Sequence, residues 1–385
     1  MAPPPFETEI SQALADNIIP GAVLRARSKD GRLDYTKSFG PWDTTTVFPM
    51  ASMTKLITSI AAAQAIERGL ITLDADIAPI LPALAAQPIL TGFDSSSGQP
   101  ILRKRQKPIT LRHLLTHSYG QTYGFADPSR TGRYLETLGR RAEFPAGDRS
   151  AEETYDHPLL FEPGEAWAYG PGIDWAGLAV ERVSGLALED FVRRHVFAPL
   201  GVLRGDSTFF PARRPGLLAR VARVSARDDG TGKLVPPDGE VDPSQVGFAL
   251  GGSGLYATVD DYFRVVESLL LDDEKLLKKE TAELLFQPQL RADSGVKLFP
   301  GVVGWTPPLA EGYTWSLAGL LTPAGNGHRG KGFLQWGGAY NSIWFIDREA
   351  GLTALLATCV SPSGDAQIAE LIKKYELGIY ELLRA

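Results

Sequence analysis

The chain has 385 residues, 44% of them hydrophobic and 22% charged, which is typical of a soluble globular protein. Its 39 basic and 45 acidic residues give a net charge of −6, so the composition gives no reason to expect nucleic acid or an anionic membrane as a partner. A chain of this length can form one large composite domain or two ordinary ones.

The first residues and the apolar runs carry no signal for export or membrane insertion. Residues 1–5 have no basic segment followed by an apolar one, and apolar runs such as 351–360 are far too short to cross a bilayer. The single cysteine, Cys359, rules out an internal disulfide, which fits a reducing compartment. We therefore expect a cytoplasmic protein with no membrane partner.

The N-terminal part has the pattern of a helix, two strands and a second helix. Apolar residues recur at helical spacing over 6–19, and a Pro-Gly pair ends that pattern. Residues 21–28 and 33–39 then favour two strands joined by a turn. A longer apolar helical pattern runs over 52–69 and ends on a glycine, the residue preferred after a helix C-terminus.

The middle of the chain changes to short helices, prolines and polar loops. Thr110 is predicted to cap a short helix that ends at His117. Residues 91–107 have the composition of a loop insertion, with a polar tip and a basic end. A further helix is predicted over 173–183, closed by Gly185.

The C-terminal third returns to strands. Thr258 is predicted to cap a helix, and residues 333–335, 341–346 and 352–360 have the pattern of antiparallel strands. An amphipathic helix over 365–383 ends the chain.

Strands near both ends and helices between them predict the architecture. We expect an α/β fold, an antiparallel sheet flanked by helices and built from both termini, with a helical insert. Residues 1–72 and 206–385 would form the sheet domain and residues 73–205 a mainly helical domain. The active site would lie at the interface of the two.

Ser52 and Lys55 are the first candidates for catalysis. Three residues apart at the start of a helical pattern, they lie one turn apart on the same face. The positive end of the helix dipole favours an alkoxide and disfavours a charged lysine, as burial does, so Lys55 is a candidate acceptor for the serine proton. The same spacing recurs at Ser294 and Lys297, but a strand-like run follows there, so we take that pair as a chance match.

Two further pieces complete a predicted acyl-transfer site. Tyr169 follows a Pro-Gly turn and precedes a helix, so its phenol is placed to shuttle a proton to a leaving group. Trp336, Gly337 and Gly338 end a strand, where glycines allow a close approach of the backbone to a substrate. The amides of Ala339 and Ser52 could then form an oxyanion hole, worth about 3 kcal/mol per donor.

These three pieces, in this order, resemble the serine β-lactamase and penicillin-binding-protein superfamily. Residues 109–118 read I-T-L-R-H-L-L-T-H-S and 162–164 read E-P-G, both similar to segments of that family. Residues 167–170 (W-A-Y-G), 173–177 (I-D-W-A-G) and the 91–107 insertion resemble its esterase branch. That branch includes family VIII carboxylesterases and, more similar still, fungal transesterases and acyltransferases of the lovastatin-side-chain type.

The resemblance implies a role for each piece. Ser52 would be the nucleophile, Lys55 and Tyr169 its acid and base partners, and residues 336–338 the counterpart of the K-T-G strand of β-lactamases. It implies an ester hydrolase or acyltransferase that needs no metal or organic cofactor. The donor would be a small-molecule ester or thioester, with a thioester on an acyl-carrier protein as an open alternative, and the acceptor either water or an alcohol.

Departures from the family pattern point to a neutral ester. Trp336 stands where β-lactamases have a cationic lysine, and Pro171 stands where they keep an asparagine, so this chain lacks both groups that hold a charged amide substrate. The candidate substrate-binding residues are Trp336, Gly337, Gly338, Tyr340, Tyr119, Tyr123, Phe125 and Trp344. The aromatic ones fit core packing as well as ligand contact.

Other functions are less well supported. No serine has the G-x-S-x-G context of an α/β-hydrolase, and the G-x-G-x-x-A match over 252–257 lacks the alternating strands and helices of a dinucleotide site. His113 and His117 have metal-ligand spacing but no third ligand nearby in sequence, so we take them as structural. β-Lactamase or D-Ala-D-Ala peptidase activity, or a catalytically silent binding protein on the same fold, remain as alternatives.

Overall fold

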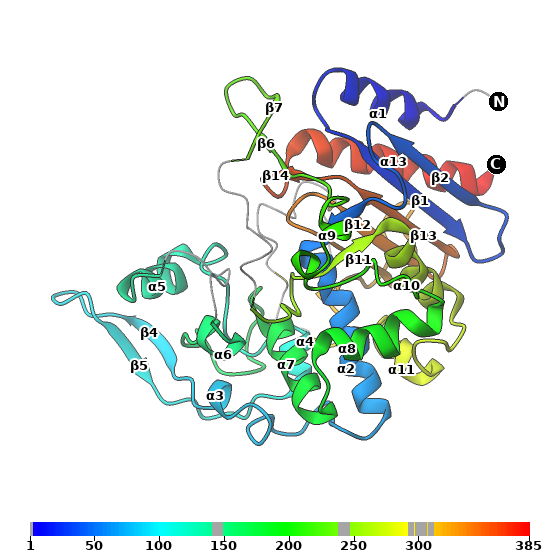
Figure 1. Cartoon of the computed structure of the whole chain (residues 1–385). Coiled ribbons are helices and arrows are strands. Elements are labelled where there is room, and N and C mark those ends of the chain that lie inside the picture. Colours follow the sequence, from blue (N-terminus) through cyan, green and yellow to red (C-terminus); the bar gives the residue numbers. More distant parts are fainter. Residues whose placement is uncertain (1–2, 141–148, 238–246, 292–295, 297–305, 307–311) are drawn as a thin grey trace.

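Strands from both ends of the chain form one antiparallel sheet (Figure 1). The computed structural model describes residues 3–140, 149–237, 247–291, 296, 306 and 312–385. Seven strands lie in the order β2-β1-β13-β12-β11-β10-β9, with every neighbouring pair antiparallel. They are β1 (Ala22–Ser28), β2 (Asp34–Phe39), β9 (Thr314–Trp315), β10 (Leu320–Thr322), β11 (Phe333–Gly337), β12 (Ile343–Asp347) and β13 (Leu352–Ala357). The predicted α/β class and the assembly of the sheet from both termini are confirmed.

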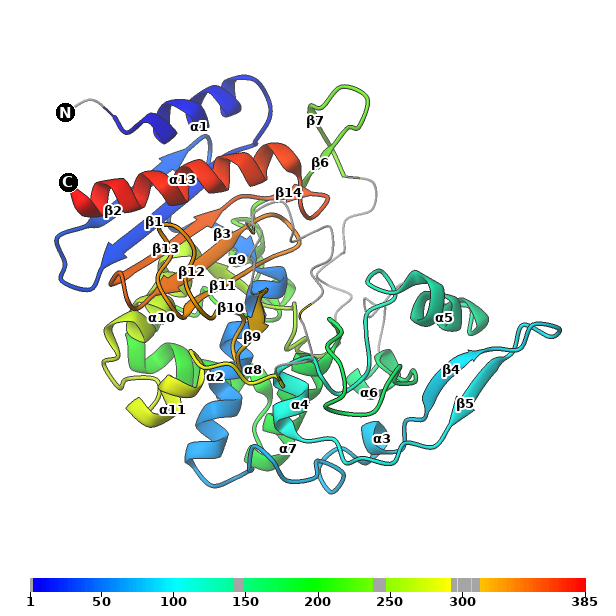
Figure 2. The ribbon, with the colours of Figure 1, turned by 180° about the vertical axis from the view of Figure 1, so that it is seen from behind.

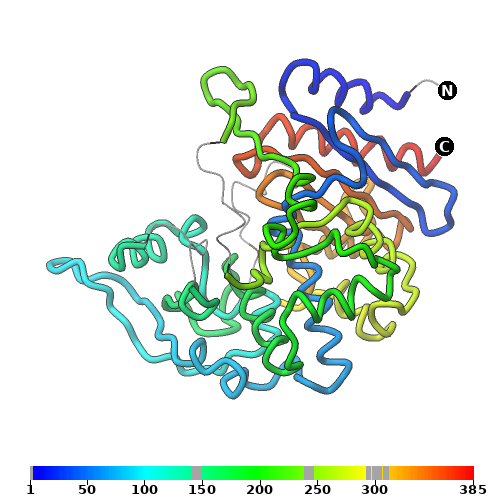
Figure 3. The backbone as a smooth tube through the Cα atoms, in the orientation of Figure 1, coloured from blue at the N-terminus to red at the C-terminus, as the bar shows by residue number. Residues whose placement is uncertain are grey.

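Helices cover both faces of this sheet. On one face lie α1 (Pro5–Ala15) and α13 (Ala366–Arg384), which pack on each other and bring the two termini to the same side (Figures 1 and 3). The alternation of side chains directs Phe345 of β12 to this face, where its ring stacks on Tyr380 of α13. On the other face α10 (Val259–Leu271) packs against β1, β12 and β13.

Further helices and smaller sheets surround this frame. Among the described residues, the other helices are α2 (Thr54–Glu67), α3 (Pro82–Ala85), α4 (Leu111–Leu115), α5 (Arg133–Thr137), α6 (Ala151–Thr154), α7 (Gly172–Ser184), α8 (Leu188–Val192), α9 (Pro215–Leu218) and α11 (Lys279–Leu284). The short helical turns are η1 (Ala51–Met53), η2 (Pro128–Gly132), η3 (Arg193–Phe197), η4 (Ala198–Leu200) and η5 (Pro211–Arg213). The smaller sheets are β3 (Val47–Pro49) with β8 (Tyr256–Thr258), β4 (Ile89–Phe93) with β5 (Pro100–Arg103), and β14 (Val360–Ser361) with β6 (Ser225–Arg227) and β7 (Leu234–Val235).

The predicted loop insertion at 91–107 is wrong. Residues 89–103 form the antiparallel hairpin β4–β5, which projects from the rest of the molecule (Figures 1 and 2). Its polar tip is the hairpin turn, because the Asp94 carboxylate accepts the backbone N–H groups of Ser96 and Ser97. Aspartate closes such turns with its own side chain, which explains why the tip has the composition of a loop.

Four predicted element boundaries shift by a few residues. The first helix ends at Ala15 rather than Ile19. The helix capped by Thr110 ends at Leu115, with the capping bond to the His113 N–H present. The strand predicted over 352–360 is interrupted after Ala357. There the Ser342 hydroxyl accepts a hydrogen bond from the Thr358 N–H and donates one to the Thr358 C=O. The final helix begins one residue after its Asp365 cap.

The parts of the chain share one packed interior. α2 packs against α7, and a single cluster of buried apolar residues extends across the sheet, α2 and the helical middle. The division into a sheet domain over 1–72 and 206–385 and a helical domain over 73–205 stays a prediction. Within the described residues, no helix combines the length and the apolar character needed to span a bilayer.

The contact between α1 and α13 depends on the absence of a side chain at Gly378. A Cβ at this position of α13 would lie 2.2 Å from Cδ1 of Phe6 on α1. Phe6 is itself fixed by ring contacts with Tyr35 and Tyr375, so it has little room to move. We therefore expect Gly378→Ala to lower the free energy of unfolding by about 1–3 kcal/mol, the usual cost of overpacking.

Urea denaturation would measure this difference. Gly216→Ala is the matched control, because a Cβ at Gly216 in α9 would have no heavy atom within 4 Å. That variant should be at least as stable as the parent protein, since alanine restricts the unfolded chain. Equal stability of the two variants would contradict the packing argument.

Candidate active site

Ser52 lies in the turn η1, immediately before α2, so the predicted helix begins two residues later than expected. The preceding Ala51 has a positive φ of 45°, which non-glycine residues rarely adopt. The turn is anchored on both sides, because Met50 N–H donates to Leu255 C=O and the Tyr262 hydroxyl donates to Met53 C=O at 2.8 Å. The surrounding fold therefore fixes the backbone that carries the Ser52 hydroxyl.

The structure brings Ser52, Lys55 and Tyr169 together. Ser52 Oγ accepts hydrogen bonds from Lys55 Nζ at 3.2 Å and from Tyr169 Oη at 2.8 Å. Lys55 Nζ also donates to Gly252 C=O at 2.8 Å and lies 4.7 Å from the centroid of the Tyr169 ring. Lys55 and Tyr169 are buried, so their contacts with Ser52 are shielded from bulk water.

Trp336 supports Tyr169 instead of lining the pocket. Its indole Nε1–H donates to Tyr169 Oη at 3.3 Å, and the two ring centroids are 5.3 Å apart. Trp336 is 2% exposed and packs edge-on against Trp315. The Trp336 indole thus orients the tyrosine phenol.

The glycines after Trp336 bring two protein segments together. A Cβ at Gly338 would lie 2.6 Å from Met50 C=O, so this glycine lets the end of β11 approach the turn that carries Ser52. The N–H of Gly338 is taken up by Ser342 C=O at 2.7 Å. Ala339, whose amide is a candidate oxyanion donor, lines the same pocket as Ser52.

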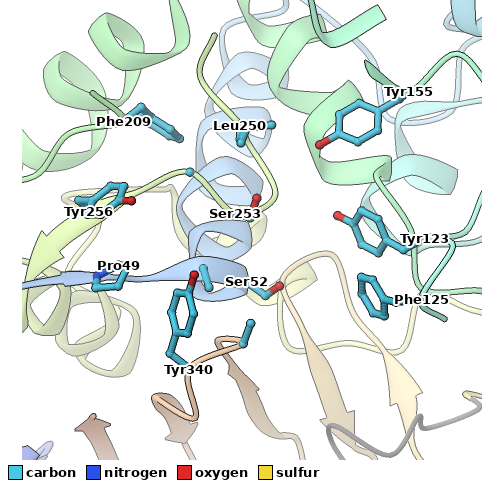
Figure 4. Close-up of a pocket in the computed structure, with 13 residues that line it drawn as sticks. Pro49, Ser52, Tyr123, Phe125, Tyr155, Phe209, Leu250, Ser253, Tyr256 and Tyr340 are labelled. Atoms are coloured by element: carbon cyan, nitrogen blue, oxygen red, sulfur yellow. The ribbon is translucent and has the colours of Figure 1, made fainter. Parts of the chain in front are cut away.

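A pocket of about 130 Å³ opens beside Ser52 (Figure 4). Its lining residues are Pro49, Ala51, Ser52, Tyr123, Phe125, Tyr155, Phe209, Leu250, Ser253, Gly254, Tyr256, Ala339 and Tyr340. The close-up shows two groups of aromatic residues around Ser52, one with Phe209, Tyr256 and Tyr340 and the other with Tyr123, Tyr155 and Phe125.

Three predicted substrate-binding residues line this pocket: Tyr123, Phe125 and Tyr340. The structure places the other predicted ones elsewhere. Tyr119 and Trp344 are fully buried, the first bonded through its hydroxyl to Gln121 and the second beside Trp336 on the next strand. Trp336, Gly337 and Gly338 do not line it either. Tyr155, Phe209, Leu250, Ser253 and Tyr256 line it without having been singled out from the sequence.

A buried carboxylate lies behind Lys55. Asp174 Oδ1 accepts the Gly252 N–H at 2.9 Å, and Gly252 C=O is the acceptor for Lys55. Burial raises the pKa of the Asp174 carboxyl, against the opposing effect of the nearby Lys55. In the sequence, Asp174 is an acidic residue in the otherwise apolar first turn of α7, within the I-D-W-A-G segment.

His117 is buried next to Tyr169 and bound to the backbone. Its Nδ1 accepts the Gly170 N–H at 3.4 Å, and its ring centroid lies 4.7 Å from that of Tyr169. His113 accepts the Thr110 N–H in the cap of α4. Over the described part of the chain, no cluster of His, Cys, Asp or Glu is placed to hold a metal. The competing match at Ser294 and Lys297 lies outside the described residues.

Comparison with known proteins shows which family this chain resembles over most of its length. The model of the family described as "Beta-lactamase" matches residues 6–375. Lovastatin esterase of Penicillium rubens is 37% identical over 398 residues, covering 97% of this chain and 98% of that protein. Monacolin J acid methylbutanoyltransferase of Aspergillus terreus is 35% identical and covers 97% and 95%. A solved structure of a mutant simvastatin synthase from Aspergillus terreus superposes with a TM-score of 0.89, at 36% identity and coverage of 98% and 94%.

The burial of His117 makes stability depend on pH. Burial, and then the charge of Lys55, hold its pKa well below the ordinary 6.5. As the pH falls through the pKa of this histidine in the unfolded chain, the unfolded chain binds one more proton than the folded protein. The free energy of unfolding therefore decreases toward acid pH. Asparagine at this position keeps an acceptor for the Gly170 N–H and tolerates the positive φ of 55°. Between roughly pH 7.5 and pH 5.5, we therefore expect the free energy of unfolding of His117→Asn to fall by about 1 kcal/mol less than that of the parent protein.

Urea denaturation of both proteins at the two pH values would measure the difference. His157 is also buried, with its pKa lowered to about 4, and contributes equally to both proteins. Subtraction therefore isolates the contribution of His117. A variant that loses as much stability toward acid as the parent would show that His117 is not held neutral in the fold.

Proposed function

The chain belongs to the Beta-lactamase family, and we propose that it transfers the acyl group of a neutral ester through a covalent acyl-Ser52 intermediate. The observation that carries this proposal is the shared hydrogen bonding of Ser52 Oγ, which accepts from both Lys55 Nζ and Tyr169 Oη. A serine hydroxyl needs a neighbouring base to become a nucleophile, and these two groups are within reach of its proton.

The first half of the reaction forms the acyl-enzyme. The Lys55–Tyr169 pair takes the proton of Ser52, and Oγ attacks the carbonyl carbon of the ester. The amides of Ser52 and Ala339 would stabilise the negative charge that develops on the carbonyl oxygen. Tyr169 then protonates the leaving oxygen or sulfur as its bond to the acyl carbon breaks.

The second half reverses these roles. Water or an alcohol gives its proton to the same pair and attacks the acyl carbon. The bond between the acyl carbon and Ser52 Oγ then breaks, and Oγ regains a proton. Trp336 assists by donating to Tyr169 Oη, which keeps the phenol oxygen directed at Ser52.

The preference for a neutral ester follows from the pocket. None of its lining residues carries a charged side chain, and several are aromatic. A substrate carboxylate buried there would lose its hydration without gaining a cationic partner. The geometry therefore favours an ester over a penicillin or a D-Ala-D-Ala peptide.

The relatives indicate the substrate class. Lovastatin esterase and monacolin J acid methylbutanoyltransferase are named for natural-product esters and their acyl transfer. We propose a small-molecule natural-product ester or thioester as donor, with an acyl-carrier-protein thioester as the alternative donor. The acceptor is water in an esterase and an uncharged alcohol in a transferase.

Trapping the intermediate tests this function. Brief exposure to a methylbutanoyl thioester should add one acyl mass, which peptide mapping assigns to Ser52. Ser52→Ala should gain no mass, because the nucleophile is gone, with the fold intact by circular dichroism. The decay of the acyl-enzyme in water, compared with its decay in the presence of the neutral lactone form of monacolin J acid, separates an esterase from a transferase.

Ser253→Ala is the matched control, because Ser253 is another serine of the same pocket. This variant should still be acylated at Ser52. Acylation at any other residue, or retention of the acyl mass in Ser52→Ala, would sink the assignment of the nucleophile.

The acid and base roles have their own test. We expect Lys55→Ala and Tyr169→Phe each to lower kcat for a p-nitrophenyl ester by at least about 10²-fold, since each removes a proton-transfer partner of Ser52. Tyr134→Phe removes a tyrosine hydroxyl on α5, outside the pocket, and should leave kcat unchanged. A near-normal rate in either catalytic variant would remove that residue from its role.

A further inference from the structure

We propose that Asp174 is a positioning residue for acyl transfer, which holds Lys55 against Ser52 through the backbone of Gly252. This inference rests on the proposed function, since it concerns the same nucleophile. It adds Asp174, which is not itself among the residues that line the pocket.

The first step is the double use of Gly252. Its N–H donates to Asp174 Oδ1 at 2.9 Å, and its C=O accepts from Lys55 Nζ at 2.8 Å. One residue therefore connects a carboxylate on α7 with the lysine on α2. The hydrogen bond from Gly252 N–H to Asp174 therefore sets the position of the Gly252 C=O, which is the acceptor for Lys55.

The second step is the close approach at this point. A Cβ at Gly252 would lie 2.3 Å from Asp174 Oδ2, so no other residue fits against the carboxylate without a shift. The neighbouring Gly251 C=O is bonded by Thr58 Oγ1 at 2.7 Å. The glycine turn is thus held between α2 and α7 by Thr58 on one side and Asp174 on the other.

The third step is the environment of the carboxylate. Asp174 is 3% exposed and lies in the first turn of the 13-residue helix α7, where the helix dipole favours a negative charge. Burial raises the pKa of this carboxyl, and the nearby Lys55 acts in the opposite direction. A buried carboxylate is retained only with several donors around it, and the site supplies them.

Two of these donors are pocket residues. The Tyr123 hydroxyl donates to Asp174 Oδ2 at 3.2 Å, and the Tyr155 hydroxyl also bonds the carboxylate. Figure 4 shows the rings of Tyr123 and Tyr155 on one side of Ser52, with their hydroxyl groups pointing in a similar direction. The carboxylate that places the acceptor of Lys55 therefore also fixes part of the substrate pocket.

A merely structural role for Asp174 makes a different prediction. If Asp174 only supported the helix and the two tyrosines, its loss would lower stability or weaken substrate binding whether or not Lys55 were present. If it acts through Lys55, its effect on the reactivity of Ser52 disappears once Lys55 is removed. A double-mutant cycle distinguishes the two cases.

The experiment measures the rate at which a small fluorophosphonate labels Ser52, together with kcat and KM for a p-nitrophenyl ester. Asp174→Asn keeps the size of the side chain and an acceptor oxygen but removes the charge. We expect it to lower both the labelling rate and kcat by about 10-fold, with KM within about 2-fold. In a Lys55→Ala background the same change should alter the labelling rate by less than about 2-fold.

Glu181→Gln is the matched control. Glu181 lies on the same helix, accepts the Leu188 N–H at 2.7 Å and has a pKa raised by burial, but it does not contact Gly252. This variant should be labelled at the parent rate. Thermal denaturation of every variant verifies that the fold is present.

Several outcomes would overturn the inference. A parent-like labelling rate in folded Asp174→Asn would do so, as would a full 10-fold effect that persists without Lys55. If Asp174→Asn does not fold, Gly252→Ala separates the carboxylate from the turn, and a parent rate in that folded variant would equally refute the proposal. Failure of the proposed function differs from all of these, because the probe would then not label Ser52 in the parent protein.

Discussion

The burial of Lys55 is the constraint on which the rest of the site depends. An amine that is 2% exposed must find acceptors inside the protein, because an unmet donor costs the full price of its desolvation. Lys55 finds them in Ser52 Oγ, three residues before it, and in Gly252 C=O, 197 residues after it. The fold must therefore bring a remote glycine turn to the start of α2 if the amine is to stay beside the serine.

Close contacts at two glycines meet this requirement, because a side chain at either position would not fit. Gly252 lies against the Asp174 carboxylate, and Gly338 lies against the backbone of Met50. Between them they fix the turn that carries Ser52 and the acceptor that holds Lys55. Tyr169 completes the arrangement from the loop before α7, with Trp336 donating to its phenol oxygen. The site is precise because its backbone supports are glycines in contact with backbone or carboxylate atoms.

This arrangement explains what the sequence could predict. The spacing of Ser52 and Lys55 is local, since one helical turn sets their geometry, and the structure brings them together as predicted. Tyr169 was found by its place between a turn and a helix. The direction of a side chain at the end of a strand is not local, which is why Trp336 was expected to line the pocket and instead supports Tyr169. The role of Asp174 is not local either, because its partner Gly252 is 78 residues away in the chain.

The same structure bears on the proposed preference for a neutral substrate. The ionisable side chains of Lys55 and Asp174 are buried behind the pocket wall, whereas the lining residues are apolar, aromatic or hydroxylic. A bound molecule therefore contacts rings and backbone, and a charge on it would lose water without finding a partner. Tyr169, which must reach the leaving group, packs against Tyr123 with ring centroids 5.4 Å apart. In the proposed reaction, the leaving group or the incoming acceptor would therefore lie on the side of Ser52 where Figure 4 shows Tyr123 and Phe125.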